Sequence, residues 1–84
     1  MKIKGTSAAL SGTTQHTSAS AVWVANSNAT THKTVTLRNA ADDASLGTLV
    51  VPAASGVVIH LTLGQGLRGD ADLLATQVDA GSGL

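Results

Sequence analysis

The 84-residue sequence predicts an all-β domain, either a small antiparallel β-sandwich or a jelly-roll-like fold. Short runs rich in Val, Ile, Leu and Thr recur along the chain, and clusters of Gly, Asn, Asp and Ser separate them, which is typical of strands joined by turns. No window carries the sustained helical spacing of apolar residues that an amphipathic helix requires. Regularly spaced short strands of this kind indicate a sandwich or a small barrel.

The beginning of the chain predicts two strands joined by a polar segment. We expect the first strand at residues 2–8 and the second at residues 21–26. Residues 11–18 between them contain no apolar side chain. We expect this Ser/Thr-rich stretch to be a flexible arm or loop that becomes ordered only against a neighbour, because nothing in it can anchor it to a core.

A hairpin follows, and its alternation is the sharpest secondary-structure signal in the sequence. Apolar and polar side chains alternate through residues 33–39, and residues 46–51 form the returning strand across a loop at 39–45. Pro52 ends the second strand because proline has no N–H group to donate to a sheet.

The rest of the chain predicts one long strand, an irregular turn and a closing strand. The long strand covers residues 56–63 and directs four apolar side chains to its inner face, namely Val57, Ile59, Leu61 and Leu63. Residues 65–72 are rich in glycine and predict an irregular turn with a short strand at residues 67–68. Residues 73–78 form the closing strand, and residues 81–84 are expected to be a loose tail of this single domain.

The composition predicts a thin core and therefore association. Hydrophobic residues make up 43% of the chain, but Trp23 is its only aromatic residue, and it has no Phe, Tyr or Cys. Burial stabilises by about 25 cal/mol per Å² of apolar surface, so small side chains in a short chain supply little. Domains of this size without disulfides or metals gain stability by associating, and we expect a homo-oligomer.

Charge and hydropathy exclude two classes of partner. The formal net charge is zero and only 12% of the residues are charged, which provides no electrostatic footprint for nucleic acid or for an anionic membrane. The sequence contains neither a secretory leader at its start nor an apolar stretch long enough to span a bilayer.

The titratable residues do not form a pattern that indicates catalysis or metal binding. The chain has no Glu and no Cys, and its three histidines, His16, His32 and His60, share no spacing that suits a metal ion. Asp42 and Asp43 are adjacent in the hairpin loop, where aspartate side chains satisfy turn backbone. We therefore expect a protein that is not an enzyme and that holds neither a metal nor a cofactor.

Three short motifs have simpler interpretations than the functions they suggest. Glycines at positions 64, 66 and 69 lack the following helix and the Lys-Ser/Thr pair of a phosphate-binding loop. Residues 68–70 spell Arg-Gly-Asp, as in integrin-binding loops, but Gly and Asp are also ordinary turn residues. Residues 28–30 form an Asn-Ala-Thr sequon, which matters only on a secretory route.

Trp23 is the most informative single residue for function. If its neighbouring valines fill the interior, strand alternation places Trp23 on an outer face, where a large aromatic side chain indicates a covered interface. The opposite register would make Trp23 the centre of the core instead. Val50, Val58 and His60 lie on the other face of their strands from the side chains expected to fill the core, as Trp23 does if its neighbouring valines are buried. Together with Trp23 they are our candidates for a protein interface.

Two stretches of sequence resemble a known group of proteins. Residues 49–59, Leu-Val-Val-Pro-Ala-Ala-Ser-Gly-Val-Val-Ile, and residues 71–78, Ala-Asp-Leu-Leu-Ala-Thr-Gln-Val, are similar to the second half of small all-β virion proteins of tailed bacteriophages. The strand at residues 21–26 and the Ser/Thr/Ala-rich start are similar in style, so the resemblance covers most of the chain.

This resemblance implies a structural role in a virion assembled in the host cytoplasm. Within the group we favour a capsid decoration (cement) protein, whose partner would be the major capsid protein or another virion protein. A compact module with a polar arm suits the junctions of a capsid lattice, where many weak copies act together. The alternatives are a neck, tail or baseplate component, and a host-surface or carbohydrate-binding module.

Overall fold

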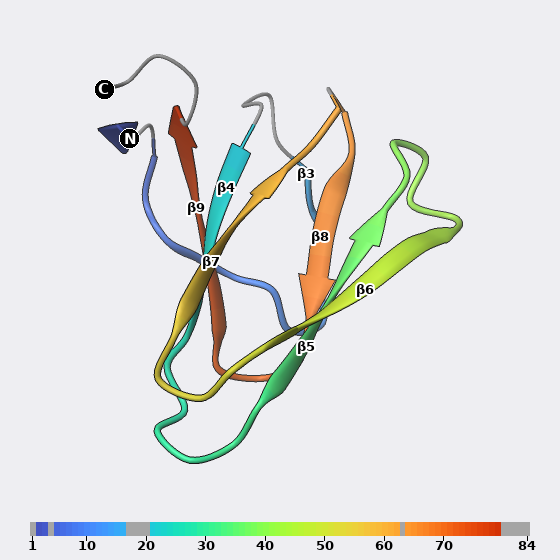
Figure 1. The fold of residues 1–84 in the computed structure, drawn as a ribbon. Coiled ribbons are helices and arrows are strands. Elements are labelled where there is room, and N and C mark those ends of the chain that lie inside the picture. The colour runs from blue at the N-terminus through green and yellow to red at the C-terminus, as the bar shows by residue number, and fades with distance from the viewer. Residues whose placement is uncertain (1, 4, 17–20, 63, 80–84) are drawn as a thin grey trace.

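The computed structural model describes residues 2–3, 5–16, 21–62 and 64–79, and it places them in two stacked antiparallel β-sheets (Figure 1). The prediction of an all-β sandwich is confirmed. No helix occurs in this part of the chain, and so none long and apolar enough to cross a membrane. The strands are β1 (Lys2–Ile3), β2 (Ala8–Ala9), β3 (Gln15–His16), β4 (Ala21–Asn26), β5 (Lys33–Arg38), β6 (Ser45–Val51), β7 (Gly56–His60), β8 (Gly66–Gly69) and β9 (Leu73–Asp79).

The two sheets differ in strand order. The first sheet has the order β1-β9-β4-β7, with β2 also paired to β9, and the second has the order β3-β8-β5-β6. Each strand pair is antiparallel. The chain passes from the second sheet to the first in the turn between β6 and β7, which Pro52 begins as predicted. In these orders β6 and β7 are the last described strands of their sheets, so each lies at an edge. Only residues 52–55 separate them in the chain.

The core lies between the sheets and is built from aliphatic side chains. Val22 and Val24 point inward from β4, so strand alternation directs Trp23 outward. The predicted inner face of β7 is confirmed where the chain is described, because Val57 and Ile59 pack on the core, and Leu61, just beyond the strand, is buried; Leu63 lies outside the described residues. The buried cluster consists of Leu10, Val22, Val24, Val35, Val51, Leu61, Leu67, Leu73 and Ala75.

The described part of the polar segment is built into the domain, which corrects the prediction of a free arm. Leu10 is fully buried, its N–H donates to the carbonyl of Leu73 over 3.1 Å, and its own carbonyl accepts from the N–H of Gly69 over 3.0 Å. This one apolar anchor, just before the segment, holds residues 11–16 against β8, where β3 pairs with it. Residues 17–18 of the predicted arm, like the predicted tail at 81–84, lie outside the described residues.

The predicted first strand is present as two short pieces. Ile3 pairs with Val78 and Ala8 pairs with Ala75. The chain therefore advances five residues from Ile3 to Ala8 while its partners on β9 are only three residues apart. Residues 5–7 are not paired with β9 as a strand, and the hydroxyl groups of Ser7 and Thr76 lie 3.0 Å apart. The alternation that predicted one strand could not reveal this irregularity.

The short strand predicted at residues 67–68 is present as β8, but the irregular turn predicted around it needs correction, because β8 extends over Gly66–Gly69 and is an inner strand of the second sheet. Gly66 and Gly69 occupy positions where a β-carbon would come within 2.6 Å of the side chains of Thr14 and Leu73, respectively. These glycines therefore allow close packing, whereas in the sequence they indicated an irregular turn.

Asn26 is the one buried polar residue in the described part of the chain, and it organises the connection after β4. Its side-chain Nδ2 donates to the carbonyl oxygens of Thr31 over 2.9 Å, Val51 over 3.1 Å and Pro52 over 3.4 Å. Its Oδ1 accepts from the N–H of Asn28 over 2.9 Å. One amide thus ties the end of β4 to the turn that carries the chain between the sheets.

Candidate protein-interaction surface

The outer face of the first sheet carries an apolar surface centred on Trp23. On β4 Trp23 lies directly between Val58 of β7 and Thr76 of β9, and all three side chains point away from the core. We call this surface the Trp23 face; its members on the described strands are Ile3, Ala9, Ala21, Trp23, Ala25, Gly56, Val58, His60, Leu74, Thr76 and Val78.

Trp23 is half-buried, because its ring lies over a glycine of the neighbouring strand. A β-carbon at Gly56 would meet the six-membered ring of Trp23, coming within 2.7 Å of Cε2 and 2.9 Å of Cη2. Gly56 therefore makes room for the aromatic ring, which spreads flat over β7 rather than projecting into solvent. The alternative that Trp23 forms the centre of the core is wrong, since the valines on either side of it occupy that place.

The described part of the Trp23 face is largely apolar, and it is partly or fully exposed apart from Ala21 and Val78, which are buried. Val58 and Leu74 are each 37% exposed and Ile3 is 76% exposed. A shallow groove of about 190 Å³ runs between Ile3 and Trp23, with Thr76 and Val78 as its other walls. Among the described residues, no Lys, Arg or Asp side chain points from β4, β7 or β9 to this face.

Three of the four sequence-predicted interface residues come together here, and the fourth does not. Trp23, Val58 and His60 share the Trp23 face. Val50 lies opposite Thr34 on the outer face of the second sheet, where it is 55% exposed. The prediction that Val50 joins the same face is therefore wrong, because the chain changes sheets at Pro52, and alternation within a strand does not specify which sheet the strand joins.

Sequence reasoning missed Ile3 and Leu74, two of the more exposed apolar members of this face. Leu74 carried a usable signal: it follows Leu73 in a predicted strand, and adjacent residues of a strand point to opposite faces. If Leu73 fills the core, Leu74 must point outward. Ile3 carried no comparable signal, because its strand has only two residues.

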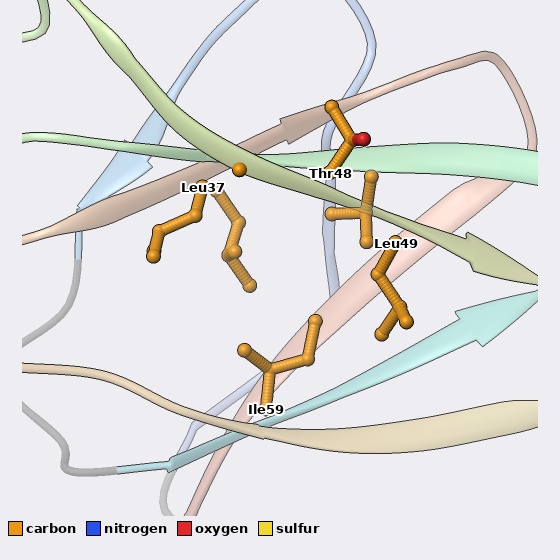
Figure 2. Close-up of a pocket in the computed structure, with 7 residues that line it drawn as sticks. Leu37, Thr48, Leu49 and Ile59 are labelled. Atoms are coloured by element: carbon orange, nitrogen blue, oxygen red, sulfur yellow. The ribbon is translucent and has the colours of Figure 1, made fainter.

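A second apolar feature is a pocket of about 210 Å³ between the two sheets, at their open edge (Figure 2). Leu37 and Leu49 of the second sheet and Ile59 of the first converge on this space, whereas Thr48 points the other way (Figure 2). Val35, Leu67 and Gly47 complete its lining. Among the described residues, no charged side chain lines this pocket.

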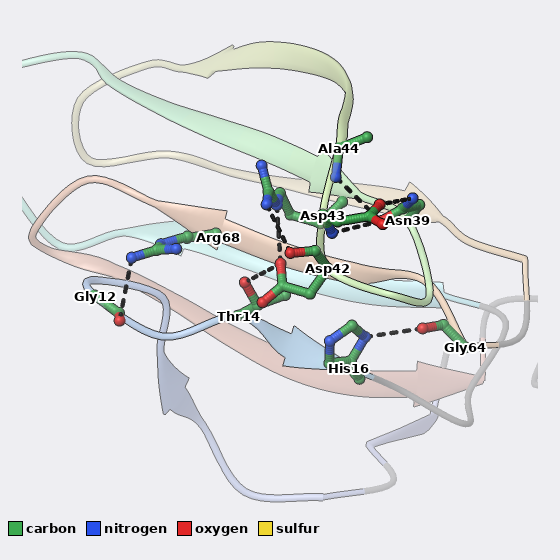
Figure 3. Close-up of polar contacts among 10 residues, drawn as sticks. Gly12, Thr14, His16, Asn39, Asp42, Asp43, Ala44, Gly64 and Arg68 are labelled. Atoms are coloured by element: carbon green, nitrogen blue, oxygen red, sulfur yellow. Dashed lines mark hydrogen bonds and ion pairs between the residues drawn. The ribbon is translucent and has the colours of Figure 1, made fainter.

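The adjacent carboxylates in the hairpin loop hold the loop in place (Figure 3). The Oδ1 atom of Asp42 accepts from Arg38 Nε over 2.9 Å and from the hydroxyl of Thr14 over 2.8 Å. Hydrogen bonds from these two groups lower the pKa of the Asp42 carboxyl below its ordinary value. Asp43 accepts from Asn39 Nδ2 over 2.7 Å. The prediction that these aspartates satisfy turn backbone is wrong, because both carboxylates accept from side chains, and Asn39 Oδ1 accepts instead from the N–H groups of Asp43 over 3.0 Å and Ala44 over 3.3 Å.

The three histidines lie apart. His16 Nδ1 is 2.8 Å from the carbonyl oxygen of Gly64, and His32 Nδ1 accepts from the N–H of Ala53 over 3.1 Å, while His60 is exposed on the Trp23 face. Within the described residues there is no group of three or more His, Cys, Asp or Glu side chains placed to hold a metal ion.

The short sequence motifs take part in the domain's own hydrogen bonding. In the Arg-Gly-Asp tripeptide, Arg68 Nη2 donates to the carbonyl of Gly12 over 3.3 Å, and Asp70 Oδ2 accepts from the N–H of Thr34 over 2.9 Å. Asn28 of the sequon accepts from the N–H groups of Thr30 and Thr31. The tripeptide thus spans β8 and the start of the next turn, and is not the tip of a protruding loop.

Comparisons of the chain with protein-family models, curated proteins and solved structures found no match.

Proposed function

We propose that this protein is a non-enzymatic structural component of a tailed-bacteriophage virion, a capsid decoration protein that binds the major capsid protein lattice and stabilises it. The resemblance of residues 49–59 and 71–78 to small virion proteins supports the class of protein. The Trp23 face supports the mode of action, which is docking on another protein.

The single observation that carries this proposal is that the described strands present exposed apolar side chains on the Trp23 face and direct no Lys, Arg or Asp side chain to it. Apolar surfaces with a central aromatic residue and few charges are typical of the buried centres of protein interfaces. Val58 and Leu74 flank the Trp23 ring and are both more than a third exposed. A docking partner would remove these side chains from water, at about 25 cal/mol of stabilisation per Å² of apolar surface.

The small size of the domain fits many weak contacts rather than one strong contact. Copies that dock at repeated positions of a lattice bind together through high effective concentration, so each needs only modest affinity. A decoration protein would stabilise the lattice by bridging neighbouring capsid subunits, and it would need no reactive group to do so.

The proposal is tested by binding to capsids assembled from the major capsid protein encoded near its gene. Val58→Asp places a charge in the centre of the Trp23 face and should abolish cosedimentation with capsids, because a buried unpaired charge is strongly unfavourable in an interface. Ala29→Asp adds the same charge in an exposed loop and should bind like the wild type. Both variants are first checked for wild-type melting.

Trp23→Ala provides a second measurement. Removal of an aromatic anchor should cost about 2 kcal/mol or more of binding, a decrease in affinity of about 30-fold. If Val58→Asp remains bound to capsids, the Trp23 face is not the docking surface. If the wild type ignores capsids but binds purified necks, tails or baseplates, the protein is one of those components, and if it binds none of these particles the proposal fails.

A further inference from the structure

Strand β6 is an unprotected edge of the second sheet. It is seven residues long, and six of the seven are exposed. Its residues Leu46, Leu49 and Val50 are 51%, 46% and 55% exposed, and the strand contains no charged residue and no proline. Its only partner among the described strands is β5.

An edge of this kind has unsatisfied capacity for pairing. The outward N–H and C=O groups of an edge strand are free to bind another strand, and natural edges are usually protected by Lys, Pro or a bulge. In β6 the register irregularity opposite Leu37 and Arg38 lies near the beginning of the strand. Residues 47–51 continue in regular register with β5 and remain available.

The inner side of β6 also has a space that a neighbouring side chain can fill. A β-carbon added to Gly47 would meet nothing within 4 Å. Gly47 and Leu49 both line the pocket of about 210 Å³ between the sheets, into which Leu37 and Ile59 also point (Figure 2). An aliphatic side chain opposite Gly47 would lie at the mouth of this pocket.

We propose that β6 pairs antiparallel with β6 of a second copy of this chain, across a two-fold axis at Thr48. Thr48 is the central residue of Ser45–Val51, so this register pairs residues 47–49 of the two copies regularly and sets the irregular start of each strand against the end of the other. The second sheet of one copy, β3-β8-β5-β6, would then continue into the second sheet of the other copy, and the two would form one sheet that runs through both molecules.

A second copy fits this edge because β6 is complementary to itself in this register. Leu49 of each copy lies opposite Gly47 of the other, where the open pocket can receive it. Val50 of each copy lies opposite Leu46 of the other, so the exposed apolar side chains of both strands cover one another. Antiparallel pairing is also the arrangement that a two-fold axis requires.

The proposed dimer uses a different surface from the capsid-binding proposal. Its strand belongs to the second sheet, whereas the Trp23 face belongs to the first. A single pair of seven-residue strands gives an interface at the small end of the range for specific complexes. We therefore expect a dissociation constant on the order of micromolar.

Charge at the two-fold axis tests the pairing. The full-length chain should show a concentration-dependent dimer in sedimentation velocity. Thr48→Lys and Thr48→Asp each place like charges directly opposite one another and should each be monomeric. An equimolar mixture of the two variants should recover the dimer, because the charges are then complementary. Val58→Asp should dimerise like the wild type.

Cysteine cross-linking tests the register, since the chain has no cysteine of its own. Thr48→Cys places the two sulfur-bearing residues opposite each other, at the Cα separation of about 4.5–5.5 Å that a disulfide spans. Val50→Cys is the matched control on the same strand, because the two copies of position 50 would be about 13 Å apart along the strands. Air oxidation should cross-link the first variant and not the second.

The outcomes separate the alternatives. A wild type that stays monomeric at millimolar concentration overturns the proposal, as does a dimer that survives both charge variants of Thr48. Cross-linking of Val50→Cys in preference to Thr48→Cys overturns the register at Thr48. A dimer that is lost in Val58→Asp but kept in Thr48→Lys would show that copies associate through the Trp23 face instead.

Discussion

The aromatic ring of Trp23 occupies the space that a side chain at Gly56 would need. A β-carbon at position 56 would approach Cε2 of the ring to 2.7 Å and Cη2 to 2.9 Å, distances that a folded protein does not tolerate. Glycine at 56 and tryptophan at 23 are therefore coupled across β4 and β7, and the free energy of unfolding should show it.

Gly56→Ala should destabilise the domain by about 1–3 kcal/mol, because the ring must move or the strands must separate. In the Trp23→Ala background the same change should cost much less, which a double-mutant cycle from chemical denaturation measures. Gly47→Ala is the matched control, since nothing lies near its added carbon, and it should change stability by less than about 0.5 kcal/mol. Additive effects at positions 23 and 56 would contradict the coupling.

Leu10→Ala should be among the most damaging truncations of a leucine in the chain. The side chain is fully buried between β8 and β9, and removal of a buried leucine costs about 2–5 kcal/mol. Leu46→Ala, which removes the same atoms from a half-exposed site, should cost less than about 1 kcal/mol. Equal melting temperatures for the two variants would show that Leu10 is not a core residue.

Asn26→Asp should destabilise the domain by about 3 kcal/mol or more at neutral pH. One oxygen of the new carboxylate would face the carbonyl oxygens of Thr31 and Val51, to which the asparagine now donates, and the N–H of Asn28 would be the one donor left to this buried charge, which is strongly unfavourable. Protonation restores a donor, so the deficit relative to the wild type should shrink as the pH falls below neutrality. A deficit independent of pH would contradict this account.

Acid should weaken the contact between residues 11–16 and the hairpin loop through Asp42. Hydrogen bonds from Arg38 and Thr14 lower its pKa in the folded state. Stability from this carboxylate is therefore fully present above the ordinary aspartate pKa of about 3.9, and it is lost as the pH falls through the lower folded value. Asp42→Asn should remove this decrease in the free energy of unfolding at acidic pH, which chemical denaturation at a series of pH values measures. Asp43→Asn, which removes a charge from the same loop, should leave the contribution of Asp42 in place.

Ala54→Gly should stabilise the domain although it removes a methyl group. Ala54 has φ of 56°, in the left-handed region, where a residue with a β-carbon is strained by roughly 1 kcal/mol. Its neighbour Ala53 has no such φ, so Ala53→Gly should destabilise by increasing the entropy of the unfolded chain. Thermal melting of the two single variants compares them directly, and a lower melting temperature for Ala54→Gly than for Ala53→Gly would contradict the argument.

The candidate surface was only partly predictable from the sequence. Alternation on β4 left Trp23 either on an outer face or at the centre of the core, and the structure decides for the outer face; alternation on β7 placed Val58 and His60 on its second face. It could not show that β4 and β7 are neighbours while β6 belongs to the other sheet, so Val50 was wrongly grouped with them. Side-chain direction is a local property, whereas the partners of a strand depend on contacts between residues distant in sequence.

The sequence by itself determined the fold class, the positions of the main strands and the inner face of the strand after Gly56, because these follow from the two-residue period of a strand and from turn residues such as Pro52. Only the tertiary structure decided three further features: that Leu10 anchors the polar segment, that Gly56 makes room for Trp23, and that β6 is left as a free edge. Each of these depends on which strands become neighbours. That choice is made by the packing of the whole chain, and no local pattern of residues contains it.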